Sequence, residues 1–259
     1  MRHVPRKRFG QNFLVDAAVV RRIVDSFGLS PGDNVVEIGP GQGALTGPLL
    51  QQLEHLTVVE LDRDLVAKLA GRYAPDKLTI HSADALGFDF GALGPSLRVI
   101  GNLPYNISTP LLFHLAEFAD RLVDITVMLQ KEVVDRMVAA PATSDYGRLS
   151  VMLQYRFSLE KLFDVPPDAF WPEPKVQSAV VRLVPRSSGE LGANDPVVLG
   201  EVVAAAFGQR RKMLRNTLAQ WIGENELAAL SIEPTWRGER LSVADYVRLA
   251  NACARSATG

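Results

Sequence analysis

Residues 34–50 read NVVEIGPGQGALTGPLL, and they contain the strongest structural signal in the chain. A run of β-branched residues ends at Ile38, glycines follow at alternate positions, and an apolar segment with helical spacing comes next. Glycine lets the backbone turn sharply and approach a ligand closely. A strand, a glycine loop and a helix in this order predict a ligand site at the carboxyl end of a strand in an open α/β sheet.

This alternation of strands and helices continues through the first half of the chain. The predicted strands are residues 34–38, 56–60, 78–82, 98–101 and 125–129, and the predicted helices are 44–53, 63–73 and 110–118. Strands that alternate with helices form a parallel sheet covered by helices on both faces. The sequence therefore predicts a doubly wound α/β fold.

The pattern changes after Lys131. Helices are predicted at 132–138 and 148–157, followed by two strand-like runs, 159–165 and 178–184, which a proline-rich stretch joins. This connection is too short to carry a crossover helix, so the two runs are expected to pair antiparallel and complete one edge of the sheet.

A second domain is predicted after a linker. Residues 185–196 are rich in Ser, Gly, Asn and Asp, a composition typical of a linker. Beyond it the sequence has only helical patterns, at 197–207, 211–221, 226–230 and 243–252. We therefore predict one domain over residues 1–186 and a small all-helical domain over residues 187–259.

The composition is that of an ordinary globular protein. Of the 259 residues, 47% are hydrophobic and 22% are charged, which excludes a wholly disordered chain and a fibrous repeat. Cys253 is the single cysteine, so an internal disulfide framework and a multi-cysteine metal site are excluded. We expect no metal and a reducing, cytoplasmic location. The longest uncharged run, 99–116, holds prolines and asparagines and is not expected to span a membrane.

Positive charge gathers in two places although the net charge is only −1. The start of the chain is basic and lacks the apolar core of a secretory signal, so we interpret it as part of the mature protein. The two clusters can contact phosphates, although either one alone is more often a solvated surface. They consist of Arg6, Lys7 and Arg8, and of Arg210, Arg211, Lys212 and Arg215, with Arg211 and Arg215 on one face of the predicted helix.

Acidic residues accompany the first three predicted strands. Glu60 ends the second strand, 21 residues after Gly39, where open α/β proteins place an acid that binds ribose hydroxyls. A nicotinamide cofactor and S-adenosylmethionine both carry such a ribose. The G-x-G-x-G spacing differs from the loop that seats a pyrophosphate, and the carboxylate of Glu37 would repel one. Asp84, after the third strand, is placed to accept from an adenine amine, or alternatively to cap a helix.

The fourth strand ends in Gly101-Asn102-Leu103-Pro104-Tyr105-Asn106, the most specific chemical signal in the chain. An aniline-like exocyclic amine is a poor nucleophile because its lone pair is delocalised into the ring. The side-chain carbonyl of Asn102 and a backbone carbonyl beside Pro104 can each accept one N–H and aim that lone pair at a methyl group. Tyr105 offers a flat face on which a base can stack, worth about 1–3 kcal/mol. A sulfonium is a good leaving group, so positioning and desolvation are expected to suffice.

These residues resemble the KsgA-type family of ribosomal RNA adenine dimethyltransferases, and the resemblance extends over nearly the whole chain. The similar blocks are QNFL from Gln11, EIGPGQGALT from Glu37, GNLPYNIST from Gly101, MLQKEVVDRM from Met128, YGRLSVMLQ from Tyr146, PPDAFWPEPKVQSAVVRL from Pro166, AFGQRRKMLRNTL from Ala206 and RGERLS from Arg237. The resemblance implies a class I S-adenosylmethionine-dependent methyltransferase fold, Rossmann-like with an antiparallel edge strand. It assigns residues 1–186 to cofactor binding and catalysis, behind a basic N-terminal arm, and residues 187–259 to RNA binding.

The family also implies a substrate and a set of site residues. The substrate is two adjacent adenosines in the 3′-terminal hairpin of 16S rRNA, in the small ribosomal subunit or its assembly precursor, dimethylated at N6 by a monomeric enzyme that aids subunit maturation. Matched to the family, the cofactor contacts are Asn12, Leu14, Gly39, Glu60, Asp84 and Asn102. The catalytic set is Asn102, Leu103, Pro104, Tyr105 and Phe170, where Phe170 is expected opposite Tyr105 across the base or, alternatively, in simple packing. Arg6, Lys7, Arg8, Arg210, Arg211, Lys212 and Arg215 are assigned to RNA.

Four other functions are weighed against this one. A resistance methyltransferase acting on large-subunit rRNA shares the fold and an Asn-x-Pro-aromatic motif, but the blocks QRRKMLRN and RGERLS favour the small subunit. A DNA adenine methyltransferase would need a further target-recognition domain. An assembly factor without methylation conflicts with the intact tetrapeptide. A dehydrogenase conflicts with the glycine spacing and lacks an acid or base for hydride transfer at a strand end.

Overall fold

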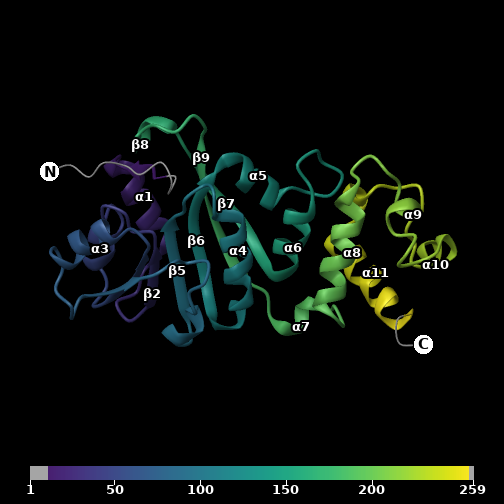
Figure 1. Cartoon of the computed structure of the whole chain (residues 1–259), viewed down its shortest axis with the longest axis horizontal. Coiled ribbons are helices and arrows are strands. Elements are labelled where there is room, and N and C mark those ends of the chain that lie inside the picture. Colours follow the sequence, from purple (N-terminus) through teal and green to yellow (C-terminus); the bar gives the residue numbers. More distant parts are fainter. Residues whose placement is uncertain (1–10, 257–259) are drawn as a thin grey trace. The chain divides into compact units, whose positions relative to one another are not determined.

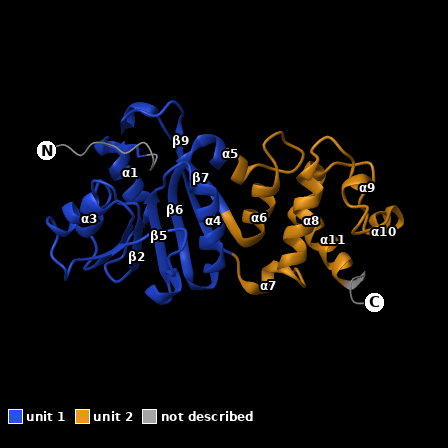
Figure 2. Cartoon of the chain, in the orientation of Figure 1, with its two compact units in different colours: residues 1–134, 159–185 blue, residues 135–158, 186–259 orange. Residues whose placement is uncertain are grey.

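The computed structural model of the chain describes residues 11–256, with the side chains of residues 11–254 (Figure 1). The chain divides into two compact units, the first made of residues up to 134 together with 159–185, and the second of 135–158 and the residues from 186 onward (Figure 2). No helix within the described part of the chain is both long and apolar enough to cross a membrane.

The first unit is built on a sheet of seven strands in the order β4-β3-β2-β5-β6-β9-β7. The strands are β2 (Asn34–Ile38), β3 (Leu56–Glu60), β4 (Leu78–Ser82), β5 (Leu97–Asn102), β6 (Leu122–Gln130), β7 (Phe157–Val165) and β9 (Ser178–Pro185). The first five are parallel, and β9 runs antiparallel to β6. This arrangement confirms the predicted fold class, with β7 and β9 adjacent at one edge.

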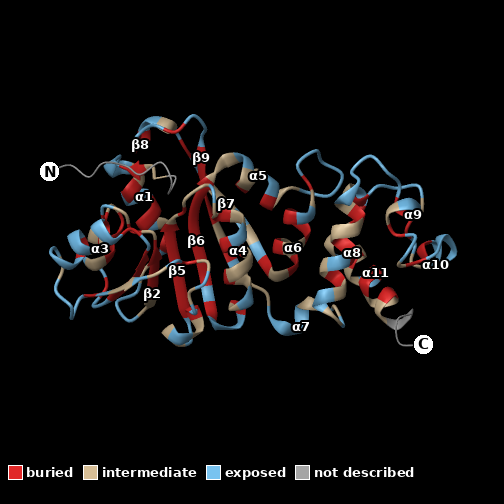
Figure 3. Cartoon of the chain, viewed as in Figure 1, coloured by how far each residue is buried: buried red, intermediate tan, exposed pale blue. Residues whose placement is uncertain are grey.

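The order of the strands reverses at β2, because β3 and β4 lie on one side of it and β5 and β6 on the other. Open α/β sheets bind ligands at such a switch point, outside the carboxyl ends of the strands. The central strands have β-branched residues on both faces and are almost completely buried (Figure 3). Buried strands of this kind hold the loops at their carboxyl ends in fixed positions.

Helices of the first unit follow the strands. They are α1 (Ala17–Phe27), α2 (Thr46–Leu50), α3 (Arg63–Ala70), α4 (Ser108–Glu117) and α5 (Lys131–Val138), the last continuing into the second unit, with 3-10 turns η2 (Phe90–Leu93), η3 (Ala119–Arg121) and η4 (Pro167–Ala169). The sequence analysis missed α1. Asp16 caps this helix by accepting from the N–H groups of Ala18 and Val19, and Gly28 ends it with a φ of +63°.

A two-stranded sheet was also not predicted. Strand β1 (Phe13–Leu14) pairs antiparallel with β8 (Phe170–Trp171), so that Leu14 lies opposite Phe170. The N–H of Val15 donates to the carbonyl of Ala169 at 2.8 Å and extends this connection. The segment that precedes α1 is therefore held by a segment about 155 positions further along the chain, at a fixed place beside the main sheet.

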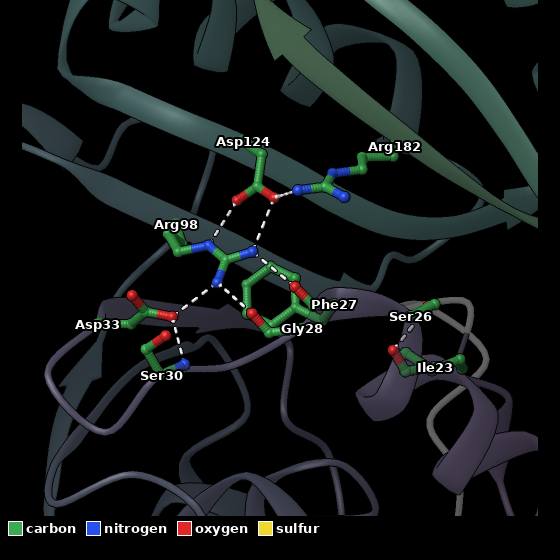
Figure 4. A network of polar contacts seen from close by, with 9 residues as sticks. All are labelled: Ile23, Ser26, Phe27, Gly28, Ser30, Asp33, Arg98, Asp124 and Arg182. Carbon is green, nitrogen blue, oxygen red and sulfur yellow. Dashed lines mark hydrogen bonds and ion pairs between the residues drawn. The ribbon is translucent and has the colours of Figure 1, made fainter.

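A buried ion network joins the amino ends of the strands (Figure 4). Arg98 in β5 donates to both carboxylate oxygens of Asp124 in β6, at 2.8 and 2.9 Å, and to Asp33 at 2.6 Å. Its other two N–H groups donate to the carbonyls of Phe27 and Gly28, at 2.6 and 2.9 Å. All five N–H donors of the Arg98 guanidinium are thus satisfied, as a buried cation requires.

The second unit is helical apart from the start of β7. Its helices are α6 (Arg148–Arg156), α7 (Ser188–Leu191), α8 (Pro196–Gly208), α9 (Leu214–Thr217), α10 (Glu224–Ala229) and α11 (Val243–Ser256), with the 3-10 turn η5 (Gly238–Arg240). Their core includes Val151, Leu199, Val202, Tyr246 and Leu249, all fully buried. Tyr246 also donates from its hydroxyl to the carbonyl of Gly238 at 2.8 Å.

Three details differ from the sequence analysis. Residues 135–158 belong with the second unit rather than with a domain over 1–186, because Val151 and Tyr155 pack into the helical core. The predicted linker 185–196 contains the short helix α7. The predicted helix 211–221 reduces to α9, because Met213 is extended with a ψ of 154° and Arg211 lies in a turn.

Candidate active site

A cavity of about 250 Å³ lies at the carboxyl ends of β2, β3 and β5, at the switch point of the sheet. The lining contains nine residues predicted from the sequence: Asn12, Leu14, Gly39, Glu60, Asp84, Asn102, Leu103, Pro104 and Tyr105. These residues come from β1, from three strand ends and from the loops that follow them. The fold therefore brings together in space positions that are up to 93 residues apart in the sequence.

The glycine loop forms one wall of the cavity. Gly39, Gly41 and Gly43 have φ values of +65°, +59° and +83°, a conformation that other residues rarely adopt. A Cβ atom at Gly41 would also lie 3.1 Å from the ring of Phe13. The N–H of Gly41 donates to a carboxylate oxygen of Glu60 at 3.1 Å, so the loop and the acid hold each other in place.

Glu60 has a fixed orientation in the cavity. Its second carboxylate oxygen accepts from the N–H of Asp62 at 2.8 Å, and the residue is only 7% exposed. Burial raises the pKa of Glu60, while its hydrogen bonds from Asp62 and Gly41 oppose that rise. A carboxylate held in this way can accept further hydrogen bonds from two neighbouring hydroxyls, as in the ribose site predicted from the sequence.

Glu37 is a second acid of the cavity, and the sequence analysis did not include it among the site residues. Its side chain is 1% exposed and accepts a hydrogen bond from the hydroxyl of Thr46 at 2.6 Å. Burial raises the pKa of Glu37 to about 8, and the nearby charge of Glu60 adds to the rise. Glu37 thus places a buried acid directly before the glycine loop.

Asp84 lies at the exposed side of the cavity. Its carboxylate accepts from the N–H of Leu86 at 3.0 Å, and residues 85–87 form a turn and a bend. The alternative role as a helix N-cap is therefore wrong for this residue. A second carboxylate oxygen, with no hydrogen bond from the described residues, is left to accept from a ligand.

These groups fit S-adenosylmethionine better than a dinucleotide. Three carboxyl groups line the cavity, and its described lining contains neither lysine nor arginine. A pyrophosphate would meet only like charge there, whereas a ligand with a ribose, an adenine amine and positive charges meets acceptors and acids.

A hydrogen bond fixes the orientation of the Asn102 side chain. Its amide nitrogen donates to the backbone carbonyl of Asn12 at 3.0 Å. The side-chain oxygen is therefore free to accept from a ligand in the cavity that Asn102 lines. Asn12, directly before β1, thus contributes to the site by fixing the direction of the Asn102 amide.

The residues after Asn102 leave a second acceptor in the same place. The carbonyl of Pro104 accepts from Ile107 at 3.2 Å, whereas that of Leu103 has no hydrogen-bond partner among the described residues. Close packing determines this path, because a Cβ at Gly101 would lie 2.5 Å from the carbonyl oxygen of Ile38. The carbonyl of Leu103, directly before Pro104, is available for the acceptor role that the sequence analysis expected, and that role stays a prediction.

Tyr105 is anchored through its hydroxyl. The hydroxyl lies 2.6 Å from that of Ser178, a fully buried residue at the start of β9. Burial raises the pKa of Tyr105, so the phenol stays neutral at ordinary pH. Ser178 was not among the predicted site residues. Its one signal in the sequence is that it lies within the block PPDAFWPEPKVQSAVVRL, which resembles the family.

The remaining predicted residues lie elsewhere. Phe170 is 4% exposed in the hydrophobic core and is absent from the cavity lining, so its stacking role stays a prediction. Arg6, Lys7 and Arg8 fall outside the described residues. The second basic cluster is exposed on unit 2, where Arg210 pairs with Glu239 at 3.8 Å and Arg215 with Glu224 at 3.9 Å.

The comparisons with known proteins agree with this geometry. Residues 2–255 match the family model described as ribosomal RNA adenine dimethylase. A protein of Aromatoleum aromaticum named ribosomal RNA small subunit methyltransferase A is 64% identical over 96% of this chain and 94% of that protein. A dimethyladenosine transferase from Plasmodium falciparum shares the fold, with a TM-score of 0.79 and 24% identity over 92% of this chain and 95% of the other. The 23S rRNA methyltransferase ErmE has a TM-score of 0.69 and 26% identity, over 94% and 100% of the two chains.

Proposed function

Because the chain belongs to the ribosomal RNA adenine dimethylase family, we propose that its cavity methylates two adjacent adenosines in the 3′-terminal hairpin of 16S rRNA. The enzyme is an S-adenosylmethionine-dependent rRNA adenine dimethyltransferase, and each adenosine receives two methyl groups at N6. The substrate proposed is the small ribosomal subunit or its assembly precursor, which implies action in the cytoplasm and a role in subunit maturation. We propose that the enzyme acts as a monomer.

The observation that carries this proposal is the pair of carbonyl acceptors beside the cavity. The side-chain oxygen of Asn102 and the backbone oxygen of Leu103 can each accept one N–H of the adenine amine, with Pro104 fixing the path of the backbone. Two such bonds draw the amine nitrogen toward tetrahedral geometry and direct its lone pair. Because the amine can lose its proton after transfer, no residue need act as a strong base.

Aromatic rings are proposed to hold the base. Tyr105 stacks on one face of the adenine, with its ring fixed by the hydroxyl contact to Ser178. Phe170 directly follows Ala169, whose carbonyl accepts from Val15 of the N-terminal segment, and is proposed to face the base from the other side once RNA is bound. This second role requires a side chain that is 4% exposed to move.

S-adenosylmethionine supplies an electrophilic methyl group on a positively charged sulfur. We propose that Glu60 accepts from the ribose hydroxyls and Asp84 from the adenine amine of this cofactor. The loop at Gly39 and the segment at Asn12 and Leu14 close around it, and Asn102 lies between the cofactor and the substrate base.

The basic residues are proposed to bind RNA phosphates. Arg211 and Lys212 are exposed and have neither an ion pair nor a hydrogen bond from their side chains within residues 11–254. Arg210 and Arg215 form long, exposed ion pairs, and Arg210 also donates to the backbone carbonyl of Ser144. Exposed ion pairs of this kind cost little to exchange for phosphates. Arg6, Lys7 and Arg8 are proposed to close over the cofactor and RNA, and the helical unit is proposed to serve as the RNA-binding part.

Transfer of labelled methyl groups from S-adenosylmethionine to purified ribosomal subunits tests the proposal. The substrate is small subunits that lack this modification, with large subunits and the Asn102→Ala variant as controls. We expect dimethyladenosine in small subunits alone, and none with the variant. Label in large subunits would assign the chain to the activity named for ErmE, and no label despite cofactor binding would indicate a non-catalytic assembly factor.

A further inference from the structure

Two segments of the helical unit are joined by backbone hydrogen bonds. The N–H of Leu214 donates to the carbonyl of Trp236 at 2.7 Å, and the N–H of Arg215 donates to the carbonyl of Pro234 at 3.1 Å. These bonds hold residues 210–215 next to residues 234–237. We call this pair of segments the Trp236 platform.

The platform exposes large apolar side chains. Trp236 is 41% exposed and Met213, beside Leu214, is 37% exposed. Val197 is the one further large hydrophobic residue that is similarly exposed in the described part of the helical unit. An indole ring in water forgoes the burial that its large apolar area favours, so an exposed tryptophan in a fixed loop indicates a contact surface.

Both segments of the platform also contain positively charged residues. Arg211 and Lys212 precede Met213, and Arg237 directly follows Trp236. All three are exposed, and their side chains have no ion pair or hydrogen bond among the described residues. Of the nearby acids, Glu224 and Glu239 pair with Arg215 and Arg210, whereas Glu233 accepts from the neutral hydroxyl of Thr235 and keeps its charge. Three unpaired cations against this one acid leave the platform with a net positive charge.

From this arrangement we propose that Trp236 is a stacking site for one unpaired base of ribosomal RNA, with Arg211, Lys212 and Arg237 on the phosphates beside that base. The inference rests on the proposed function, because it requires RNA as the substrate. A flat ring among free cations fits a single-stranded nucleotide, which offers a base face and phosphates together. Bases within a duplex are already stacked and do not offer that face.

Binding of the full chain to small subunits that lack the methyl groups tests the platform. Trp236→Leu keeps apolar bulk without a flat π surface and is expected to weaken binding about 5- to 150-fold, the range for loss of one stacked base. Trp236→Phe is expected to remain within about threefold of wild type. Val197→Ala, at an exposed apolar residue of the same unit, is the matched control and should bind as wild type does.

The salt dependence separates stacking from phosphate contact. We expect Lys212→Ala to lower the slope of log affinity against log salt by about 0.7, whereas Trp236→Leu should leave the slope unchanged. Equal thermal midpoints of the variants exclude unfolding as the cause. In methyl transfer, Trp236→Leu should raise KM and leave kcat unchanged, because Trp236 is not part of the cavity.

The inference is wrong if Trp236→Leu binds as tightly as wild type, or if Trp236→Phe is as weak as Trp236→Leu. Equal loss in both variants would indicate a partner that recognises the indole N–H or a specific apolar fit, as a protein would. Wild-type methyl transfer to small subunits is measured in the same preparation. If wild type transfers methyl groups and all variants bind equally, the stacking role of Trp236 is wrong and the proposed function stands. If wild type transfers no methyl groups, the proposed function is wrong.

Discussion

The polar groups at the two ends of the main sheet differ in whether they have hydrogen-bond partners. At the amino ends, Arg98 uses every N–H donor on Asp124, Asp33 and the two carbonyls at the end of α1. At the carboxyl ends, the oxygens of Asn102 and Leu103 have no partner within the described residues. Both oxygens lie beside the cavity and are therefore available to accept from a ligand.

The acids show the same contrast. Asp124 is fully buried, yet it accepts from two arginines, since Arg182 also donates to it at 2.7 Å. Glu37 is just as deeply buried but has a hydroxyl as its partner, and Glu60, its acidic neighbour, raises its pKa further. At the amino ends of the sheet the buried charges are paired and stabilise the fold. At the carboxyl ends the acids and acceptors remain available to bind a ligand.

Breaking the network at the amino ends is expected to have the largest effect. Asp124→Ala leaves Arg98 and Arg182 without their shared carboxylate and should lower the free energy of unfolding by about 3–5 kcal/mol. Denaturant unfolding measures this, with Glu54→Ala, at an exposed acid, as the control expected to remain within about 0.5 kcal/mol. Well below the melting temperature kcat should stay within about twofold of wild type, and a large fall in kcat would contradict the division between the two ends.

Removing an acceptor at the carboxyl ends should have the converse result. Asn102→Ala is expected to lower kcat for methyl transfer about 10²- to 10³-fold, as loss of one preorganised hydrogen-bonding group does. Asn34→Ala is the matched variant, because Asn34 begins β2 and donates to the carbonyl of Leu93 at 2.9 Å. It should cost about 1 kcal/mol of stability and leave kcat unchanged. Equal losses of kcat in both variants would refute the assignment.

The pH dependence of stability tests the buried acid. The pKa of Glu37 is about 8 in the folded chain and near its usual 4.5 when unfolded, so the folded chain holds the proton more tightly. Its contribution to stability is complete below pH 4.5 and is lost as the pH rises toward 8. Glu37→Gln keeps an acceptor for Thr46 and removes the titration, so wild type should lose about 3 kcal/mol more than the variant between pH 4.5 and 7.

Denaturant unfolding across this pH range measures the difference in slope. The groups that face Glu37 are Glu60 and Tyr73, which remain in the variant, so the slope difference reports Glu37 itself. Glu54→Gln should reproduce the wild-type slope. Parallel curves for wild type and Glu37→Gln would mean that Glu37 is ionised in the folded chain, and the contrast with Asp124 would then disappear.

Sequence reasoning succeeded where the signal is local. The strands that end at Ile38, Glu60 and Ser82 were predicted to the residue, because β-branched runs with breakers on both sides define them. Helix α1 also has a local signal, with Asp16 as N-cap and buried residues at Val20, Ile23, Val24 and Phe27 in helical spacing. That pattern is present in the sequence, but no helix was predicted from it.

Long-range contacts had no such signal. The partners of Arg98 are between 26 and 71 residues away, and the two strands β1 and β8 have only two residues each. The pKa of Glu37 depends on burial, which a single sequence does not display. The helix predicted at 211–221 fails for the same reason. The distant carbonyls of Pro234 and Trp236 accept from the N–H groups of Leu214 and Arg215, inside the predicted range, and α9 begins only there.

Removing the hydroxyl of Ser178 is expected to have the smallest effect. Ser178 lies 73 residues from Tyr105 in the sequence, and its hydroxyl contacts the hydroxyl of that ring. Ser178→Ala should lower kcat/KM about fivefold, because the hydroxyl of Tyr105 loses a bond worth about 1 kcal/mol. Tyr105→Phe should have a similar effect while keeping the stacking face. If Ser178 acts only by positioning Tyr105, the double variant should be no worse than either single variant. Additive losses would show that Ser178 acts independently of the ring, and the carboxyl end would then contain one more group with a role of its own.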